Sequence, residues 1–197
     1  MPRNMAFLAS LAAVVSLAGA VGCSSSTSAA PSGDTCSTAT VSFKSDVMAI
    51  FPGGCSLTGA CHGQPNNAPE ENLYLGHGIQ DGVNGDCLMS PATCNAAADI
   101  ATVYAAIVGV KAVENPQMDI VSTDGDIENS FLWHKVNNDM NTAAVAAGCK
   151  MAAAPLCSDC SDPSTPCGIS MPWEQLPLEP SQLCTIKNWI EQGAKNN

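Results

Sequence analysis

The sequence predicts a small, mostly α-helical domain whose long loops are cross-linked by disulfides. Several short stretches repeat apolar residues at the three-to-four-residue interval of a helix, and no convincing run alternates apolar and polar residues as a strand does. The segments between these stretches are rich in Gly, Asn and Pro, which favour turns. Eleven cysteines in 197 residues are enough to cross-link such loops.

The N-terminal segment predicts export. Arg3 supplies a positive end, residues 7–21 are a nearly unbroken apolar run, and "AVGC" closes the segment. The run is short for a membrane span, so we expect residues 1–22 to be a signal peptide that is removed. The small residues before Cys23 resemble a bacterial lipoprotein signal, in which this cysteine becomes the lipid-bearing N-terminus. The alternative is an ordinary signal peptide with an unmodified cysteine nearby.

The remaining chain divides into a tether and one domain. Residues 23–40 are dominated by Ser, Thr and Ala without an apolar period, so they would link the anchor to a domain at 41–197. After cleavage the chain carries six lysines, no arginine and 18 acidic residues, a net charge of −12. Such a chain offers no basic surface for nucleic acid, and an electrostatically attracted partner should present a basic face. We expect a membrane-anchored lipoprotein on the periplasmic or cell-surface side.

The predicted helices follow in order along the domain. A short helix at 43–51 would end at the "PGG" of residues 52–54, and residues 62–97 would be loops in which Cys87 and Cys94 form a plausible local pair. The cleanest periodicity, residues 98–108, is followed by Gly109 in a capping position. Shorter helices are expected at 127–136 and at 141–148, the second capped by Asn141. The last helix, 180–192, begins with a proline and stops at Gly193.

The cysteines favour a disulfide framework. If Cys23 carries lipid, ten remain, and an exported chain with an even number of cysteines usually pairs them. Four of them lie close together in a segment of 149–167 that is poor in large apolar residues, which predicts a cross-linked insertion; a zinc site is the less favoured alternative. These four are Cys149, Cys157, Cys160 and Cys167.

One short stretch suggests redox chemistry. In "CSLTGACHG", His62 directly follows Cys61, and Cys55 precedes that cysteine by five intervening residues. A c-type haem needs two thioether cysteines, a proximal histidine beside the second one, and often a distal methionine. Met171, in "SMPW", is the candidate methionine, because the following proline favours an extended loop. The competing interpretation is a Cys55–Cys61 disulfide that leaves His62 as a turn residue.

Several fragments together resemble a known family. "FKSDVMAIF", "CSLTGACHG", "NSFLWHKV", "MPWEQLPL" and "IKNWIEQGA" occur in an order similar to that of exported bacterial c-type cytochrome-like lipoproteins. The resemblance covers most of residues 41–197 except the cysteine-rich insertion. It implies a cytochrome c-like helical fold with Cys55, Cys61 and His62 at the haem-attachment position and Met171 as the distal ligand. The gap between the two cysteines departs from the usual two residues.

These observations predict an electron carrier with one covalent c-type haem, a redox partner protein and no further catalytic residue. The alternative is a haem-free, disulfide-stapled cell-surface binding module on the same frame. An enzyme is third, because no hydrolase, metalloprotease or phosphate-binding motif is present. His134 and His77 fit packing and loop positions better than ligation. The other methionines after the signal, at 48, 89, 118, 140 and 151, are expected in the core or in loops.

Overall fold

The computed structural model of the protein describes residues 36–56, 62–63, 73–77, 97–149, 166–172 and 176–197. The predicted signal peptide, Cys23 and most of the tether lie outside these residues. So do Cys61, Cys157, Cys160 and the two cysteines that were predicted to pair locally, Cys87 and Cys94. The described part is helical without a strand; the only extended pairings in it are three isolated bridges at residues 108–130.

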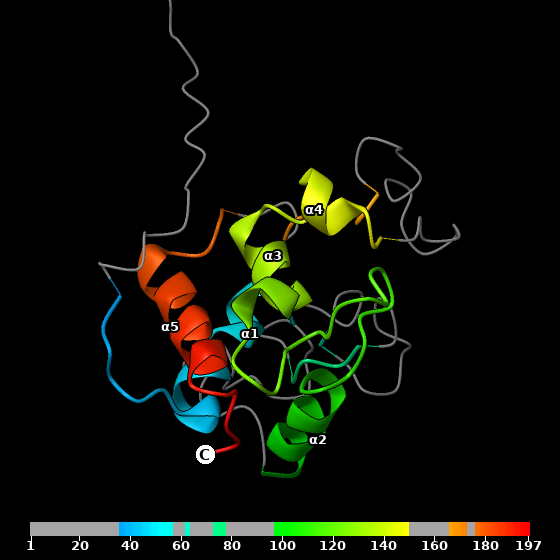
Figure 1. The fold of residues 1–197 in the computed structure, drawn as a ribbon. Helices are drawn as coiled ribbons and strands as arrows, with labels where there is room; N and C mark the ends of the chain where they lie inside the picture. Colours follow the sequence, from blue (N-terminus) through cyan, green and yellow to red (C-terminus); the bar gives the residue numbers. More distant parts are fainter. Residues whose placement is uncertain (1–35, 57–61, 64–72, 78–96, 150–165, 173–175) are drawn as a thin grey trace, which may run out of the picture.

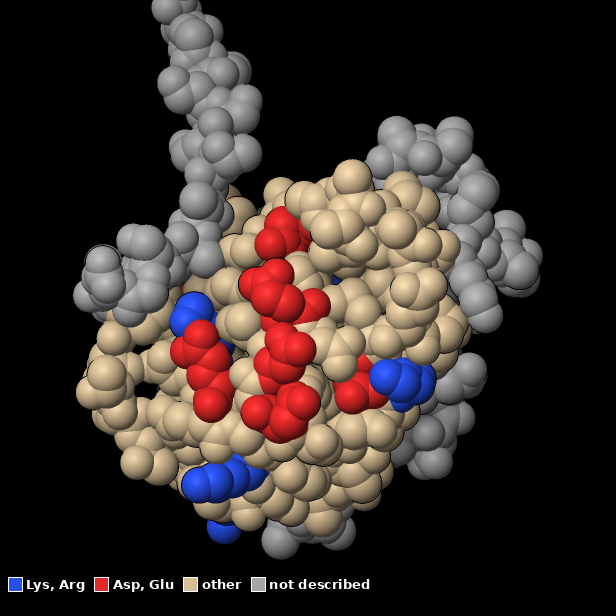
Figure 2. All heavy atoms as spheres, in the orientation of Figure 1, with Lys and Arg blue, Asp and Glu red and all other residues tan. Residues whose placement is uncertain are grey.

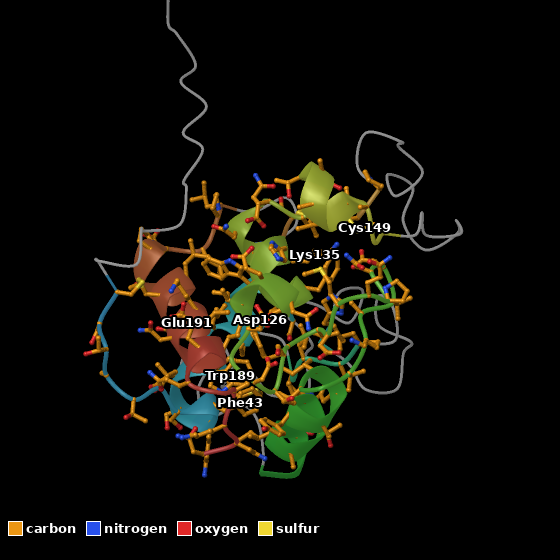
Figure 3. The ribbon with its side chains drawn as sticks, viewed as in Figure 1. Phe43, Asp126, Lys135, Cys149, Trp189 and Glu191 are labelled. Carbon is orange, nitrogen blue, oxygen red and sulfur yellow. A yellow bond between two sulfur atoms is a disulfide. The ribbon has the colours of Figure 1, made fainter. Side chains whose placement is uncertain are left out.

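The C-terminal helix organises the core. Helix α5 (Pro180–Glu191) begins at a capping box of Glu179 and Gln182 and buries the stripe that the periodicity predicted, Leu183, Ile186, Trp189 and Ile190. Trp189 stacks on Phe43 at a centroid distance of 5.0 Å. Phe43 belongs to a short π-helical turn, η2 (Phe43–Val47), so the first and last elements of the domain pack together (Figures 1 and 3).

Polar contacts and a disulfide reinforce this junction. Cys36 is bonded to Cys184 in α5. Asn197 accepts hydrogen bonds from the backbone N–H groups of Phe43 and Lys44, and the Gln192 side chain bonds the backbone on both sides of Thr40. These contacts close the domain at the place where the chain enters it.

Helix α2 (Ala97–Ile107) confirms the second predicted helix. Ile100, Val103 and Ile107 are buried, and Gly109 follows with a φ of +70°, a value that glycine adopts readily. The Tyr104 hydroxyl donates to the Ala194 carbonyl over 2.8 Å, which ties α2 to the segment after α5.

The short helices differ from the prediction. Helix α1 (Phe51–Gly54) contains the Pro-Gly-Gly sequence that was expected to end a helix, because Pro52 sits in a first turn where its missing N–H costs nothing. The expected helix at 127–136 is split into a 3-10 turn, η6 (Ile127–Asn129), and α3 (Phe131–Asn137). Ser130 separates them in an extended conformation.

Asn141 is not the cap of the next helix. Helix α4 (Ala143–Ala146) has Thr142 at its N-cap. The Asn141 side chain instead accepts from the backbone N–H of Cys167 and donates to the Gly168 carbonyl. Together with the Cys149–Cys167 disulfide, these bonds hold residues 166–168 beside α4. None of the described helices is both long and apolar enough to cross a bilayer.

Candidate functional site

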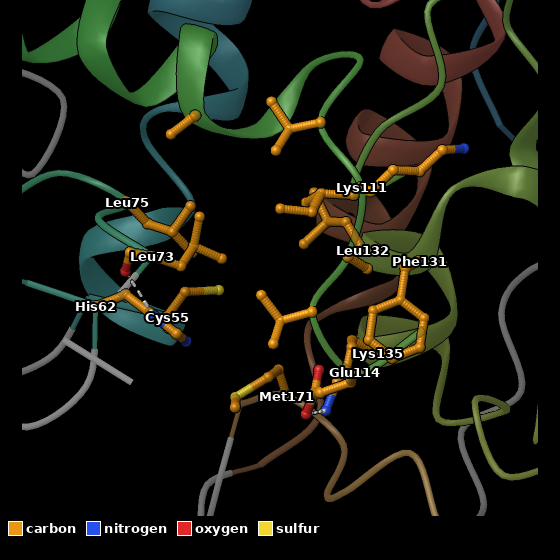
Figure 4. Close-up of a pocket in the computed structure, with 15 residues that line it drawn as sticks. Cys55, His62, Leu73, Leu75, Lys111, Glu114, Phe131, Leu132, Lys135 and Met171 are labelled. Atoms are coloured by element: carbon orange, nitrogen blue, oxygen red, sulfur yellow. Dashed lines mark hydrogen bonds and ion pairs between the residues drawn. The ribbon is translucent and has the colours of Figure 1, made fainter. Parts of the chain in front are cut away.

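A largely apolar pocket lies between α1, the segment after α2, and α3 (Figure 4). The pocket is open to solvent and its cavity volume is about 200 Å³, so a larger ligand would extend to the opening. Figure 4 shows Cys55, His62, Leu73 and Leu75 on one side and Leu132 and Phe131 on the other. The remaining lining residues are Ala106, Val110, Lys111, Ala112, Val113, Glu114, Ile120, Lys135 and Met171.

Cys55 enters the pocket from the end of α1. It is the C-cap of that helix, and its N–H donates to the Phe51 carbonyl over 2.8 Å. The cysteine is only 3 % exposed. Its carbonyl in turn accepts from the backbone N–H of His62 over 3.3 Å. This bond brings His62 beside Cys55 although six residues separate them.

His62 is held in one orientation by a backbone carbonyl. Its Nδ1 lies 2.7 Å from the Leu73 oxygen, and the ring is 6 % exposed. Because a carbonyl oxygen can only accept, Nδ1 must carry the proton in this hydrogen bond. In a neutral imidazole, Nε2 then has the lone pair, as a metal-binding histidine requires. The Leu75 N–H bonds the His62 carbonyl over 2.9 Å and fixes the same two segments from the other side.

Met171 reaches the pocket from the loop 166–172. Its backbone N–H donates to the Lys135 carbonyl on α3 over 2.9 Å, and the residue is half-buried. The thioether therefore reaches the pocket from a different segment than Cys55 and His62 do. Figure 4 shows it at the end of the pocket that also carries Lys135 and Glu114.

Lys135 and Glu114 form an ion pair at this end of the pocket. The Nζ–Oε1 distance is 2.7 Å, and both side chains are largely buried. The Lys135 ammonium also donates to the carbonyls of Cys167 and Ile169, over 2.9 and 3.1 Å, and lies 5.3 Å from the centre of the Phe131 ring. Its positive charge is thus matched by one carboxylate, two carbonyl dipoles and an aromatic face.

The structure brings together three of the four residues that the sequence analysis selected. Cys55, His62 and Met171 line one pocket, whereas Cys61 lies outside the described residues. Sequence reasoning missed Lys135 and Glu114. Nothing in "WHKV" or "KAVENP" marks these two residues as partners, because their contact depends on how the segment after α2 packs against α3.

The other candidates lie elsewhere. His134 is 2 % exposed and has both ring nitrogens in hydrogen bonds, Nδ1 to Asp139 over 2.7 Å and Nε2 to the Glu128 carbonyl over 3.1 Å, which confirms a packing role. His77 lies in a loop, 3.9 Å from Asp99 and edge-on to Tyr74. Met48, Met118 and Met140 are buried as predicted, and the methionines at 89 and 151 lie outside the described residues.

The cysteine-rich insertion is closed by a disulfide between its first and last cysteines. Cys149 and Cys167 are bonded to each other, so in this form they are not ligands of a four-cysteine zinc site. No group of three or more His, Cys, Asp or Glu side chains in the described part of the chain is placed to hold a metal ion.

The pocket is the structural basis on which a function can be assigned. It combines a thiol, an oriented imidazole and a thioether, which are the donors that covalent haem ligation uses. No protein-family model, curated protein or solved structure matches the chain. The assignment of function therefore depends on these donors and on the pocket that contains them.

Proposed function

We propose that the protein is an extracytoplasmic electron-transfer protein with a cytochrome c-like domain and one covalent c-type haem. Cys55 and Cys61 would form the thioether bonds, His62 would be the proximal ligand and Met171 the distal ligand. The observation that supports this proposal is the convergence of Cys55, His62 and Met171 on one apolar pocket, the first two from one local motif and the third from a distant segment of the chain. When bound, haem would supply reversible one-electron chemistry.

The chain's own residues have distinct tasks in this proposal. The Leu73 carbonyl orients the His62 ring and selects the tautomer that leaves the lone pair on Nε2. The apolar walls, among them Leu75, Ile120 and Leu132, exclude water and lower the local dielectric. A haem larger than this open cavity would keep one edge accessible at the mouth, as electron exchange with a partner requires.

The spacing of the two cysteines is compatible with attachment at the second one. Cys61 is adjacent to His62 in the sequence, so the link between the second thiol and the proximal ligand is the same as in a site with a shorter gap. The extra residues lie between Cys55 and Cys61. They would have to bulge away from the ring, and Gly59 gives this stretch backbone freedom.

The proposal includes export and a charged partner. Two disulfides among the described cysteines fit an oxidising compartment, and the predicted signal and Cys23 would place the domain at a membrane through a lipid. Figure 2 shows a column of acidic side chains on the face that carries α3 and α5; Asp126 and Glu191, labelled in Figure 3, lie on this face. A redox partner with a basic face would be attracted to it.

The test is a spectrum and an intact mass of the native protein, made in a host with haem-attachment machinery. We expect haem absorption bands that persist after denaturation and a mass increase of one haem. A Cys55→Ser, Cys61→Ser double variant should lose both, whereas a Cys36→Ser, Cys184→Ser variant should keep both because neither cysteine lines the pocket. A parent protein without haem but with a Cys55–Cys61 disulfide would favour the binding module instead.

A further inference from the structure

We propose that Lys135 is the positioning residue for Met171, and that its ammonium group fixes the loop from which the thioether enters the pocket. The inference rests on the proposed haem function for its consequence, but the anchoring itself depends only on contacts within the chain. It gives a role to Lys135, a buried residue that is not one of the predicted haem ligands.

The contacts of Lys135 span the loop. Its ammonium donates to the carbonyls of Cys167 and Ile169, and its own backbone carbonyl accepts from the Met171 N–H over 2.9 Å. One residue of α3 thus contacts the loop at three places. Within the described structure, every hydrogen bond made by residues 169–171 has Lys135 as its partner.

The other covalent and hydrogen-bonded attachments of the loop, among the described residues, lie at its start. The Cys149–Cys167 disulfide and the two Asn141 hydrogen bonds hold residues 167 and 168. Neither reaches residue 169 or beyond. Apart from its own packing against the core, Met171 is therefore positioned more directly by Lys135 than by the disulfide, which acts on the start of the loop.

Glu114 offsets the free-energy cost of burying the Lys135 ammonium. A lone ammonium among apolar side chains would be strongly disfavoured, and the Glu114 carboxylate at 2.7 Å supplies the compensating charge. The three donors of the ammonium are then matched by three acceptors, one carboxylate oxygen and two carbonyl oxygens. This geometry fixes the ammonium, and through it the loop, relative to α3.

The consequence concerns the distal side of the haem. If the ammonium is removed, the loop loses two charge-assisted bonds, one to Cys167 at its start and one to Ile169, two residues before Met171. Met171 would then leave the pocket more often. Thioether ligation would weaken and the reduction potential would fall, whereas attachment through Cys55, Cys61 and His62 would be retained.

The experiment compares the parent with four variants, one of them the conservative Lys135→Arg. Lys135→Met keeps the stem and the backbone carbonyl but removes the donors. Lys111→Met is the matched control, because Lys111 also lines the pocket but pairs with Asp119 and has no described contact with residues 166–172. Glu114→Gln removes the anion and leaves the Lys135 donors in place, which separates the effect of net charge from that of loop anchoring.

Two readouts are needed. Hydrogen exchange at the Met171 amide, measured on the protein as purified, reports loop opening whether or not haem is present. We expect Lys135→Met to raise it at least about tenfold, the factor that one lost charge-assisted bond implies, and Lys111→Met to leave it unchanged. In haem-loaded protein, Lys135→Met should weaken the thioether-to-iron charge-transfer band and lower the potential, and Lys135→Arg should restore part of both.

The outcomes separate the two proposals. Unchanged Met171 exchange in a folded Lys135→Met protein would overturn the positioning role, and an equal loss of the band in Lys135→Met and Lys111→Met would do the same by assigning the effect to charge. A parent without haem, in which Lys135→Met still accelerates exchange, would refute the haem function and leave the anchor intact. If Lys135→Met fails to fold, Lys135→Gln replaces it, because its uncharged amide ends one atom short of the Nζ position and so loses the charge-assisted bonds to Cys167 and Ile169.

Discussion

His62 and Met171 reach the pocket with different kinds of support, so their replacement should have different effects. His62 is held by backbone hydrogen bonds beside Cys55, within the segment where attachment would occur. Met171 comes from a separate loop. His62→Ala should therefore impair assembly and lower the yield of haem-loaded protein. Met171→Ala should keep covalent haem but change its spectrum and lower its potential, because a thioether ligand is lost.

The measurement is a comparison of haem content, spectrum and potential. Met118→Ala is the matched control, since Met118 is buried in a second cluster with Phe131 and Met140 and does not line the pocket. It should cost about 2 to 5 kcal/mol of unfolding free energy but leave the spectrum unchanged. A Met171→Ala protein with the parent spectrum would show that Met171 is not the ligand.

The His134–Asp139 pair predicts a defined pH dependence of stability. Burial by itself would lower the pKa of His134, but the hydrogen bonds to Asp139 and to the Glu128 carbonyl outweigh it, so the pKa lies above its ordinary value of 6.5. Burial likewise opposes ionisation of Asp139, yet the bonds from His134 and Asn137 lower its pKa below 3.8. Both side chains are therefore charged between pH 3.8 and pH 6.5, the ordinary pKa values of the two groups.

The sign follows from the two shifts. The stabilisation from His134 is complete below its unfolded pKa and is lost as the pH rises through the raised folded value. The stabilisation from Asp139 is complete above its unfolded pKa and is lost as the pH falls through the lowered one. Relative to Asp139→Asn, the parent should be more stable by about 1 to 2 kcal/mol near pH 5.5, and the difference should shrink towards pH 9. Urea denaturation at both pH values checks this; a constant difference would contradict it.

At the scale of the element, α5 should carry a large share of the stability. Ile186 is fully buried on the stripe that packs against η2 and α3. Ile186→Ala should lower the unfolding free energy by about 2 to 5 kcal/mol, from lost apolar burial and the cavity that remains. Glu191→Ala, on the exposed face of the same helix, removes only the ion pair with Lys187 and should cost about 0.5 kcal/mol. Similar losses in the two variants would show that the stripe is not the main contact.

Helices α2 and α5 could be predicted because each repeats an apolar stripe over three turns and ends at a glycine. The shorter elements could not, since a stripe in one or two turns does not distinguish a helix from a tight turn. Phe43 and Phe51 show this: both are buried as the period predicts, but they lie in two separate turns. Asn141 is a residue type that often caps helices, but its side chain forms hydrogen bonds with Cys167 and Gly168 instead.

The site was predictable only in part. Cys55 and His62 belong to one local motif, so their proximity follows from the sequence. Met171 was selected by its order in the chain, and its place in the pocket depends on packing between distant segments. The Lys135–Glu114 pair had no local signal at all, because both residues look like surface charges when read alone. Long-range contacts of this kind determine the distal side of the pocket.

At the scale of the whole molecule, two disulfides act on different parts of the structure. Cys36–Cys184 joins residues 148 apart and closes almost the whole domain, next to the junction of η2 with α5. Cys149–Cys167 joins residues 18 apart and holds the start of the loop that carries Met171. A cross-link stabilises mainly by restricting the unfolded chain, so the longer loop should contribute more.

Removing each disulfide separately should therefore give opposite patterns. Cys36→Ser with Cys184→Ser should lower the unfolding free energy by about 5 kcal/mol, and Cys149→Ser with Cys167→Ser by about 3 kcal/mol. In haem-loaded protein, the first variant should keep the parent spectrum because neither Cys36 nor Cys184 lines the pocket. The second should show partial loss of the thioether signal, since residues 167 and 168 then keep only the packing of residue 167 and, among the described bonds, those from Asn141 and Lys135. Urea titrations and spectra of the two variants, with peptide mapping to verify the remaining pairs, provide the comparison. A larger spectral change in the first variant would contradict the assignment of the shorter disulfide to the Met171 loop.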